Sequence, residues 1–298
     1  MSASAAKPES RLTIAITATA EADLPLPVAE ILEDLQDSLL LVPVASHEEA
    51  DLHVQIQANA IYRFYARGET SALAAFRIPV KKIRALPRKL RYLLEHVAAF
   101  RNLLHLQAPT EALKQAVKIE FLQLKTPASR KATAEVAPPL TNDNGEILLK
   151  SGDHLAIALT NFTPSPLYCY IVALDPRQQA VSLVYPYQAD ASARLRPNES
   201  VLVGSGPRYF VEMQLPQGIS SSADVFKVFV GSSTIQPAVM IMPPLGQRQD
   251  PPTDPYGSGS CLDRELRRLL LGLVGNTPLP DFAADPWWSQ TQVVRVTA

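Results

Sequence analysis

The sequence is poor in cysteine, in glycine and in any excess of one charge. Its two cysteines, Cys169 and Cys261, exclude a disulfide framework and a multi-cysteine zinc site. Its 28 Lys and Arg nearly balance 29 Asp and Glu, so the net charge of −1 attracts neither nucleic acid nor acidic membranes to the chain as a whole. The apolar runs are far shorter than the roughly 20 residues of a membrane-spanning helix. The N-terminal MSASAAKPES has no apolar segment of the kind found in signal peptides. We therefore expect a cytoplasmic protein without a membrane contact.

Hydrophobic residues are plentiful, at 47% of the chain against 19% charged residues, which predicts a large buried core and excludes global disorder. The 26 prolines outnumber the 12 glycines, as is typical of chains with many strand ends and stiff linkers. A length of 298 residues accommodates two domains.

Residues 150–186 give the clearest structural signal. Leu155, Ile157 and Leu159 alternate with small or polar residues, as in a half-buried strand. The run 167–174 is apolar on both faces, and after a turn at 175–179 a third alternating run ends in Tyr185. Short strands between Pro, Asn and Asp turns predict a β-sandwich. Cys169 lies inside the middle run, so we expect its thiol to be buried.

The rest of the chain extends this pattern to an α+β fold. We expect an N-terminal mixed α/β unit (1–109) packed on an antiparallel β-sandwich (110–247), followed by a Pro-rich linker, an amphipathic helix and a closing strand (248–298). The expected helices cover residues 28–40, 86–106 and 261–273. The expected strands outside 150–186 cover residues 11–19, 51–57, 60–67, 74–80, 117–121, 201–203, 209–215, 224–230, 238–242 and 292–297.

No metal or cofactor site is predicted. His47 and His53 are six residues apart in a loop-to-strand stretch, whereas metal-binding helices present histidines four apart. His96, inside a predicted helix, is expected to be a structural histidine, and His154 to belong to a turn at a strand start. The run Asn142-Asp143-Asn144-Gly145-Glu146 has part of a calcium loop but lacks its distal glutamate, and Asn-Gly favours a hairpin turn.

One local cluster of basic residues precedes and enters the second predicted helix. A nucleic acid or an acidic protein face is one interpretation of this cluster, and a solvated helix face opposite the leucine stripe is the other. The cluster consists of Lys81, Lys82, Arg84, Arg88, Lys89 and Arg91.

The predicted C-terminal helix carries leucines on one side, which either dock on the chain's own domain or lie in the groove of a partner. These leucines are Leu262, Leu266, Leu269, Leu270 and Leu273.

Four stretches of the sequence, in this order, resemble a known protein region. They are ADLHVQIQANAIYRFYAR, LRYLLEHVAAFRNLLHLQAP, LKSGDHLAIALTNFTPSPLYCYIVALD with a following VYP, and DVFKVFV with a following MPPL. Together they span most of residues 50–245. They resemble the non-catalytic C-terminal region that follows the protease domain in many bacterial caspase-like and metacaspase-type proteins.

The resemblance implies a β-sandwich that accompanies a caspase-like protease as its downstream region, its partner or its target, in bacterial defence or cell-death signalling. The protease domain itself is missing, and neither cysteine has the pattern of an activating histidine. We therefore expect a non-enzymatic interaction or regulatory module without catalytic residues. The alternatives are a nucleic-acid or signal-molecule sensor that uses the basic cluster at 81–91, and a hydrolase with unrecognised residues.

Overall fold

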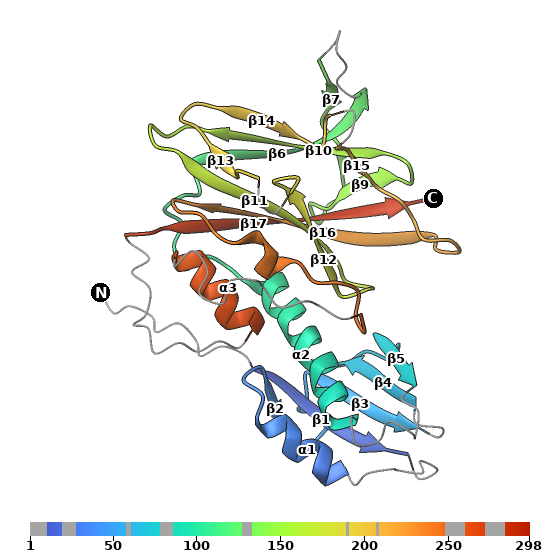
Figure 1. The fold of residues 1–298 in the computed structure, drawn as a ribbon. Helices are drawn as coiled ribbons and strands as arrows, with labels where there is room; N and C mark the ends of the chain where they lie inside the picture. The colour runs from blue at the N-terminus through green and yellow to red at the C-terminus, as the bar shows by residue number, and fades with distance from the viewer. Residues whose placement is uncertain are drawn as a thin grey trace. The chain divides into compact units, whose positions relative to one another are not determined.

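The computed structural model describes residues 11–19, 28–57, 61–77, 86–126, 133–188, 191–206, 209–247, 260–271 and 284–298, which form an α+β fold (Figure 1). It divides into two compact units. Unit 1 lies within residues 1–102 and 268–275, and unit 2 within residues 103–267 and 276–298. The first boundary falls at residue 102, inside a long helix, where the sequence suggested residue 109.

Unit 1 is built on one five-stranded sheet, sheet A, in the order β2-β1-β3-β4-β5. β1 pairs in parallel with β2 and β3, whereas β3, β4 and β5 form an antiparallel meander. Helix α1 precedes β2, and α2 follows β5 along the chain. The bounds are β1 Leu12–Ala18, α1 Val28–Gln36, β2 Leu41–Pro43, β3 Leu52–Gln57, β4 Ile61–Ala66, β5 Ala74–Arg77 and α2 Leu86–His105.

Alternation along the strands gives sheet A one buried face. In β3, Leu52, Val54 and Ile56 are buried, and the residues between them are partly exposed. α1 contributes Ile31 and Leu35 to the core. The helix expected over 28–40 ends at Gln36, because the apolar run that follows enters β2 instead.

Unit 2 contains two further sheets. Sheet B has the order β14-β10-β6-β7, with β15 also paired to β10. Sheet C has the order β12-β11-β16-β17-β9-β8, with β13 also paired to β11. The bounds in sheet B are β6 Val117–Thr126, β7 Glu135–Ala137, β10 His154–Asn161, β14 Ser200–Val203 and β15 Val211–Glu212. Those in sheet C are β8 Leu140–Thr141, β9 Ile147–Lys150, β11 Leu167–Asp175, β12 Ala180–Tyr185, β13 Arg194–Leu195, β16 Ser221–Gly231 and β17 Trp287–Thr297.

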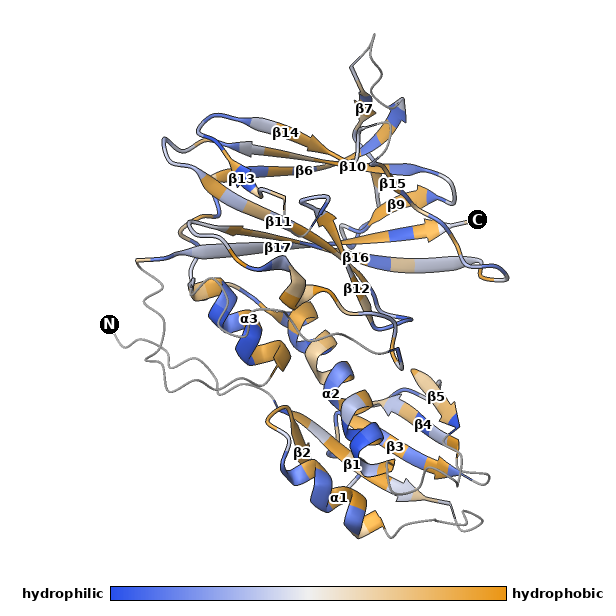
Figure 2. Cartoon of the chain, in the orientation of Figure 1, coloured by the Kyte–Doolittle hydropathy of each residue, from blue (hydrophilic) through white to orange (hydrophobic). Residues whose placement is uncertain are grey.

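Sheets B and C enclose one apolar core, which confirms the β-sandwich. Leu155, Ile157 and Phe121 enter it from sheet B, and Phe226 and Val228 from sheet C. The rings of Phe121 and Phe226 meet edge to face, with centroids 6.4 Å apart. Figure 2 shows hydrophobic residues concentrated along the central strands. All described pairs of the sandwich are antiparallel except β9 with β17, which is parallel.

Two expected strands of the sandwich are wrong in detail. Residues 238–242 form a 3-10 helix, Pro237–Met240, followed by a bridge between Met242 and Val181. Proline at the start of this segment removes a donor that a strand would need. The strand expected over 209–215 is reduced to β15 and a bridge from Phe210 to Ser205.

Other expectations are confirmed. Residues 142–146 form the turn of the β8–β9 hairpin, in which the Asn142 side-chain oxygen accepts from the amides of Asn144 and Glu146, both at 3.0 Å. Cys169 is buried. The closing strand is longer than expected, since it begins at Trp287. In the described part of the chain, no helix is long and apolar enough to cross a membrane.

Candidate functional site

A cavity of about 660 Å³ lies in unit 2, along the edge strand β12. Its walls come from the ends of β11 and β16, from β12, from Tyr187 and Gln188 after β12, and from the segment 241–244. This volume falls within the range of about 300–1,000 Å³ that is usual for ligand pockets. The cavity therefore has room for a ligand or for a side chain of another protein.

Two carboxylates enter this cavity from neighbouring strands. β11 and β16 are antiparallel, and their last paired residues are Leu174 and Val225. The next residue on each strand is an aspartate, Asp175 on β11 and Asp224 on β16, and both line the cavity. Asp224 lies on the same side of β16 as Phe226, which belongs to the sandwich core. The acidic pair thus continues the inner faces of two central strands.

The two carboxylates are held differently. Asp175 is a turn residue, as the sequence predicted, because its Oδ1 accepts from the amides of Arg177 at 2.8 Å and Gln178 at 3.1 Å. Burial raises the pKa of Asp224 to about 6, and the carboxylate of Asp175 adds to this rise, while the Arg177 guanidinium opposes it. A half-buried carboxylate next to a second carboxylate favours any positive charge that enters the cavity.

The remaining walls combine apolar and polar groups. Leu183, Met242, Pro243 and Pro244 provide apolar surface. Gln178, Gln188 and Ser182 add amide and hydroxyl groups. The segment with Met242 is fixed to β12 by two hydrogen bonds between the backbones of Val181 and Met242, at 2.8 and 3.0 Å. The cavity wall is consequently tied to the edge of the sheet.

The sequence pattern does not single out Asp224, because DVFKVFV predicts simply a strand. A usable signal was present. In a strand, Asp224 lies on the same side as Phe226 and Val228. A charged residue therefore occupies a core-facing position at the start of an apolar run. Asp175 was recognised as a turn residue but not as half of a pair, because the pairing of β11 with β16 joins residues about 50 positions apart in sequence.

The basic cluster predicted at 81–91 is placed only in part. Lys81, Lys82 and Arg84 lie outside the described residues. Arg88 and Lys89 are exposed on α2. Arg91 is engaged within unit 1, since its Nε lies 3.1 Å from Glu95 Oε1 and its Nη1 donates to the Asp34 carbonyl at 3.4 Å. Of the described members, Arg88 and Lys89 are therefore the two whose side chains face solvent.

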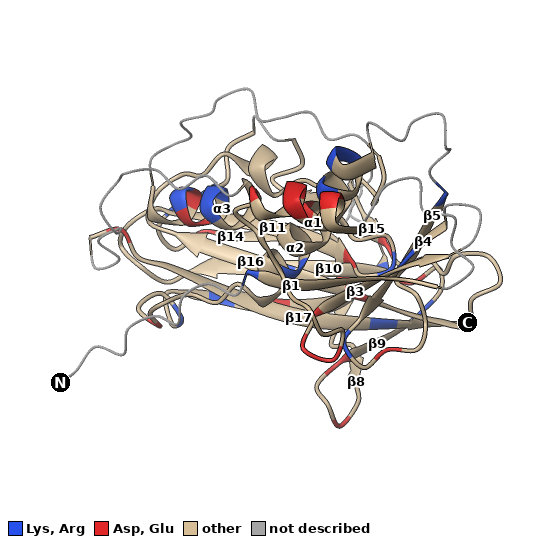
Figure 3. Cartoon of the chain, turned by 90° about the horizontal axis from the view of Figure 1, so that it is seen from below, with Lys and Arg blue, Asp and Glu red and all other residues tan. Residues whose placement is uncertain are grey.

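Four of the five leucines of the predicted C-terminal helix are buried, as the own-domain alternative predicts. Helix α3, Cys261–Leu271, buries four of them in its own chain, because they occupy the apolar side of a helix whose other residues are mostly charged. Both signs of charge lie along α3 (Figure 3). The buried leucines are Leu262, Leu266, Leu269 and Leu270, and Leu273 lies outside the described residues.

The N-terminus of α3 is fixed by polar contacts. Asp263 Oδ2 accepts from Arg267 Nε at 2.8 Å and its Oδ1 from the Gln236 amide at 2.9 Å, and both side chains of the ion pair are at most 5% exposed. Ser260 Oγ accepts from the Asp263 amide at 3.2 Å, as an N-cap. These contacts indicate a structural role for the polar side of α3.

The two cysteines are not arranged as nucleophiles. Burial raises the pKa of Cys169 to about 12, and burial also raises the pKa of the Cys261 thiol. A reactive cysteine requires the opposite shift, because the thiolate is the nucleophile. Arg264 Nη2 lies 3.7 Å from the Cys261 sulfur, but this contact does not reverse the direction of the shift.

The candidate histidines do not converge on one site. His47 and His53 are brought together, with ring centroids 5.3 Å apart, and burial followed by the charge of His47 lowers the pKa of His53. His96 is buried in α2, and the His154 ring packs on Phe210 at the start of β10. Among the described residues, no three His, Cys, Asp or Glu side chains converge as metal ligands.

A buried lysine lies on the opposite side of β16 from Asp224. Lys227 is 1% exposed, and its Nζ donates to the Leu104 carbonyl at 2.9 Å, in the last turn of α2 and within unit 2. The Nζ also lies 5.9 Å from the centre of the Phe229 ring. Burial lowers the pKa of Lys227 to about 8. Its contact with a helix C-terminus places the positive charge where the helix dipole favours it.

The chain matches no protein-family model, and it matches no curated protein sequence.

Proposed function

We propose that this chain is a non-enzymatic binding module whose sandwich cavity holds a cationic side chain of a partner protein. The observation that carries the proposal is the pair Asp175 and Asp224 in a cavity on the sandwich edge. A cation about 4 Å from a carboxylate gains about 4 kcal/mol at an effective dielectric constant near 20. Relief of the repulsion between the two carboxylates adds to this gain.

A protein segment suits the site better than a free small cation. The cavity runs along an edge strand and has apolar walls, so it contacts the alkyl stem of lysine or arginine as well as the charged end. Apolar walls give little benefit to a small hydrated amine.

The partner we propose is a caspase-like protease, acting in cis or in trans, with this chain as a regulatory module in bacterial defence or cell-death signalling. Support comes from the order of the four sequence stretches that resemble the region downstream of such proteases. The raised pKa of both thiols disfavours cysteine protease chemistry in this chain itself.

The test is a fluorescence anisotropy titration of the purified chain with labelled peptides that contain arginine, and with matched peptides in which glutamate replaces arginine. We expect the arginine peptides to bind and the glutamate peptides not to bind. Asp224→Asn is expected to weaken binding about tenfold, whereas Asp143→Asn, an exposed carboxylate in the β8–β9 turn, is the charge-matched control. Equal binding by the two variants would contradict the assignment, and competition by spermidine at equal concentration would indicate a free amine as the ligand.

A second candidate function is acid–base catalysis, which the raised pKa of Asp224 next to Asp175 favours. Against it, Asp175 already accepts two backbone hydrogen bonds through Oδ1. Hydrolysis of chromogenic glycosides or esters that is lost in Asp224→Asn would establish catalysis in place of simple binding.

A further inference from the structure

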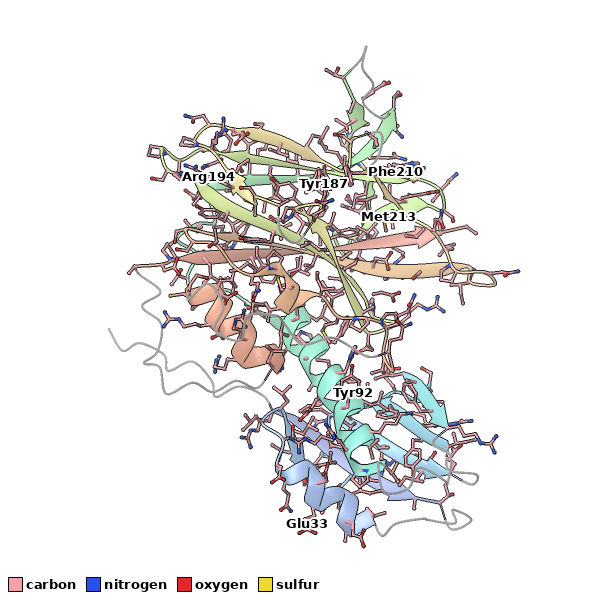
Figure 4. All side chains as sticks on the ribbon, in the orientation of Figure 1. Glu33, Tyr92, Tyr187, Arg194, Phe210 and Met213 are labelled. Atoms are coloured by element: carbon pink, nitrogen blue, oxygen red, sulfur yellow. The ribbon has the colours of Figure 1, made fainter. Side chains whose placement is uncertain are left out.

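Two stacked aromatic side chains, Tyr187 and Tyr209, form an exposed surface next to the cavity in unit 2. They are 39% and 48% exposed. Tyr187 is marked in Figure 4. Tyr187 lines the cavity, so this aromatic surface and the acidic pair share a residue. Exposed apolar groups that gather in one place on a soluble protein often mark a binding surface.

The aromatic rings are held in defined positions. Tyr209 stacks on Tyr187 with ring centroids 4.5 Å apart and an interplanar angle of 20°, and Tyr185 meets Tyr187 edge to face at 5.9 Å. The Tyr187 hydroxyl oxygen accepts from the Gly204 amide at 3.3 Å. Phe210, which is 47% exposed, packs on the His154 ring at 5.2 Å on the outer face of β10 and is not part of this surface. A ligand that binds to rings already fixed in place loses little side-chain entropy to their ordering.

Gly204, directly after β14, lies close to the backbone of β10. Its φ is +79°, and a Cβ at this position would lie 2.8 Å from the Leu155 carbonyl oxygen. Its amide is also the donor to the Tyr187 hydroxyl. The hydrogen bond that holds the Tyr187 ring therefore depends on a backbone geometry that glycine permits and other residues rarely adopt.

Fixed tyrosine rings next to two carboxylates suit a ligand that combines proline with a basic side chain. Proline-rich segments adopt an extended helix before they bind, and they dock in grooves lined by aromatic residues. A basic residue at one end of such a segment complements an acidic pair. A nucleic acid strand also stacks on aromatic rings, but its phosphates would meet Asp175 and Asp224, which disfavours it.

We propose that the occupant is an extended, proline-containing segment of a partner protein with an arginine or lysine next to its prolines. This inference rests on the proposed function and adds the aromatic subsite. The prolines contact Tyr187 and Tyr209, and the basic side chain enters the cavity between Asp175 and Asp224. Because Tyr187 lines the same cavity as the two aspartates, the basic residue lies close in sequence to the bound prolines.

The experiment is anisotropy with three labelled peptides: one with arginine and a proline run, one with alanines in place of the prolines, and one with glutamate in place of the arginine. Each is titrated against the intact chain and against the variants Tyr209→Ala, Tyr209→Phe and Asp224→Asn. Phe162→Ala serves as the matched control, because Phe162 is 58% exposed and belongs to neither the cavity nor the aromatic surface. Circular dichroism and thermal melting confirm that each variant is folded.

We expect Tyr209→Ala to weaken binding of the proline peptide about tenfold, Tyr209→Phe to keep it, and Phe162→Ala to leave it unchanged. If Tyr209→Ala has no effect while Asp224→Asn weakens binding, the aromatic subsite is wrong and the proposed cation site stands. If Asp224→Asn has no effect while Tyr209→Ala weakens binding, the proposed function is wrong. Equal binding of the proline and alanine peptides overturns the proline assignment, and tighter binding of single-stranded DNA than of any peptide overturns the choice of occupant.

Discussion

Replacing Lys227 with methionine is expected to change how the stability of unit 2 depends on pH. The side chain is 1% exposed, and among the described residues its Nζ donates to one carbonyl, that of Leu104. Burial lowers its pKa from 10.5 to about 8. At 1.36 kcal/mol per pKa unit, this difference corresponds to about 3 kcal/mol of destabilisation whenever the folded protein must bind the proton.

The sign follows from proton binding. Between pH 8 and 10.5 the unfolded chain binds more protons at this lysine than the folded chain does, so the free energy of unfolding rises with pH. The stability that belongs to neutral Lys227 is fully present above pH 10.5, where neither state binds the proton. It is lost as the pH falls through about 8, because the folded protein must then bind the proton as well. Relative to Lys227→Met, which cannot titrate, the unaltered protein should gain about 2.5 kcal/mol between pH 7 and pH 10.

The assay is urea unfolding followed by tryptophan fluorescence at pH 7, 8, 9 and 10. Both tryptophans of the chain, Trp287 and Trp288, lie on β17 and report on unit 2. The exposed Lys150→Met is the matched control and should leave the pH dependence unchanged. At pH 7 the Lys227→Met protein should be about as stable as the unaltered protein or more stable, because the lost hydrogen bond costs only about 1–3 kcal/mol. A stability difference that stays constant from pH 7 to pH 10 would refute the reasoning.

Three further changes have expected outcomes. Asp224→Asn should raise the free energy of unfolding at pH 7 by about 1–3 kcal/mol, since burial and Asp175 lift its pKa from 3.8 to about 6, and the gain should vanish below pH 4 in the same urea assay. Because Asp224 takes up a proton near its pKa of about 6, peptide binding to the unaltered protein should weaken as the pH falls from 7 to 5. Anisotropy should show no such decline in the Asp224→Asn variant. Asp263→Ala should lower the free energy of unfolding by about 3–5 kcal/mol, because it leaves the Arg267 guanidinium buried without its carboxylate, and calorimetry that finds less than about 1 kcal/mol would contradict this.

The sequence predicts the helices and strands of this fold better than it predicts which strands pair with each other. Alternation in residues 155–159 identifies β10, and the short apolar run 167–174 identifies β11, which is buried on both faces over most of its length. Helix α2 is likewise evident from its leucine stripe. Periodicity fails at residues 238–242, where Pro237 starts a 3-10 turn. It also fails for short strands such as β8, whose two residues are too few to show a period.

The candidate site follows from pairings that periodicity does not reveal. Asp175 and Asp224 come together because β11 pairs with β16, and Tyr187 stacks on Tyr209, a residue far from it in sequence. Local sequence specifies each strand but not which distant strand becomes its neighbour. Asp224 and Lys227, charged residues inside an apolar strand, distinguish the sequence of this strand from that of an ordinary core strand.

The place of β17 in sheet C has a consequence for folding during synthesis. β17 pairs with β16 on one side and with β9 on the other, so it is an inner strand. Until residues 287–297 have emerged from the ribosome, β16 and β9 each have one edge without its partner strand β17. Roughly 55 residues separate β16 from β17, which at about 5–20 residues per second leaves an interval of several seconds. Throughout that interval the apolar edge of β16 offers unpaired backbone to other nascent chains, and chaperone binding there would protect the sandwich from misassembly.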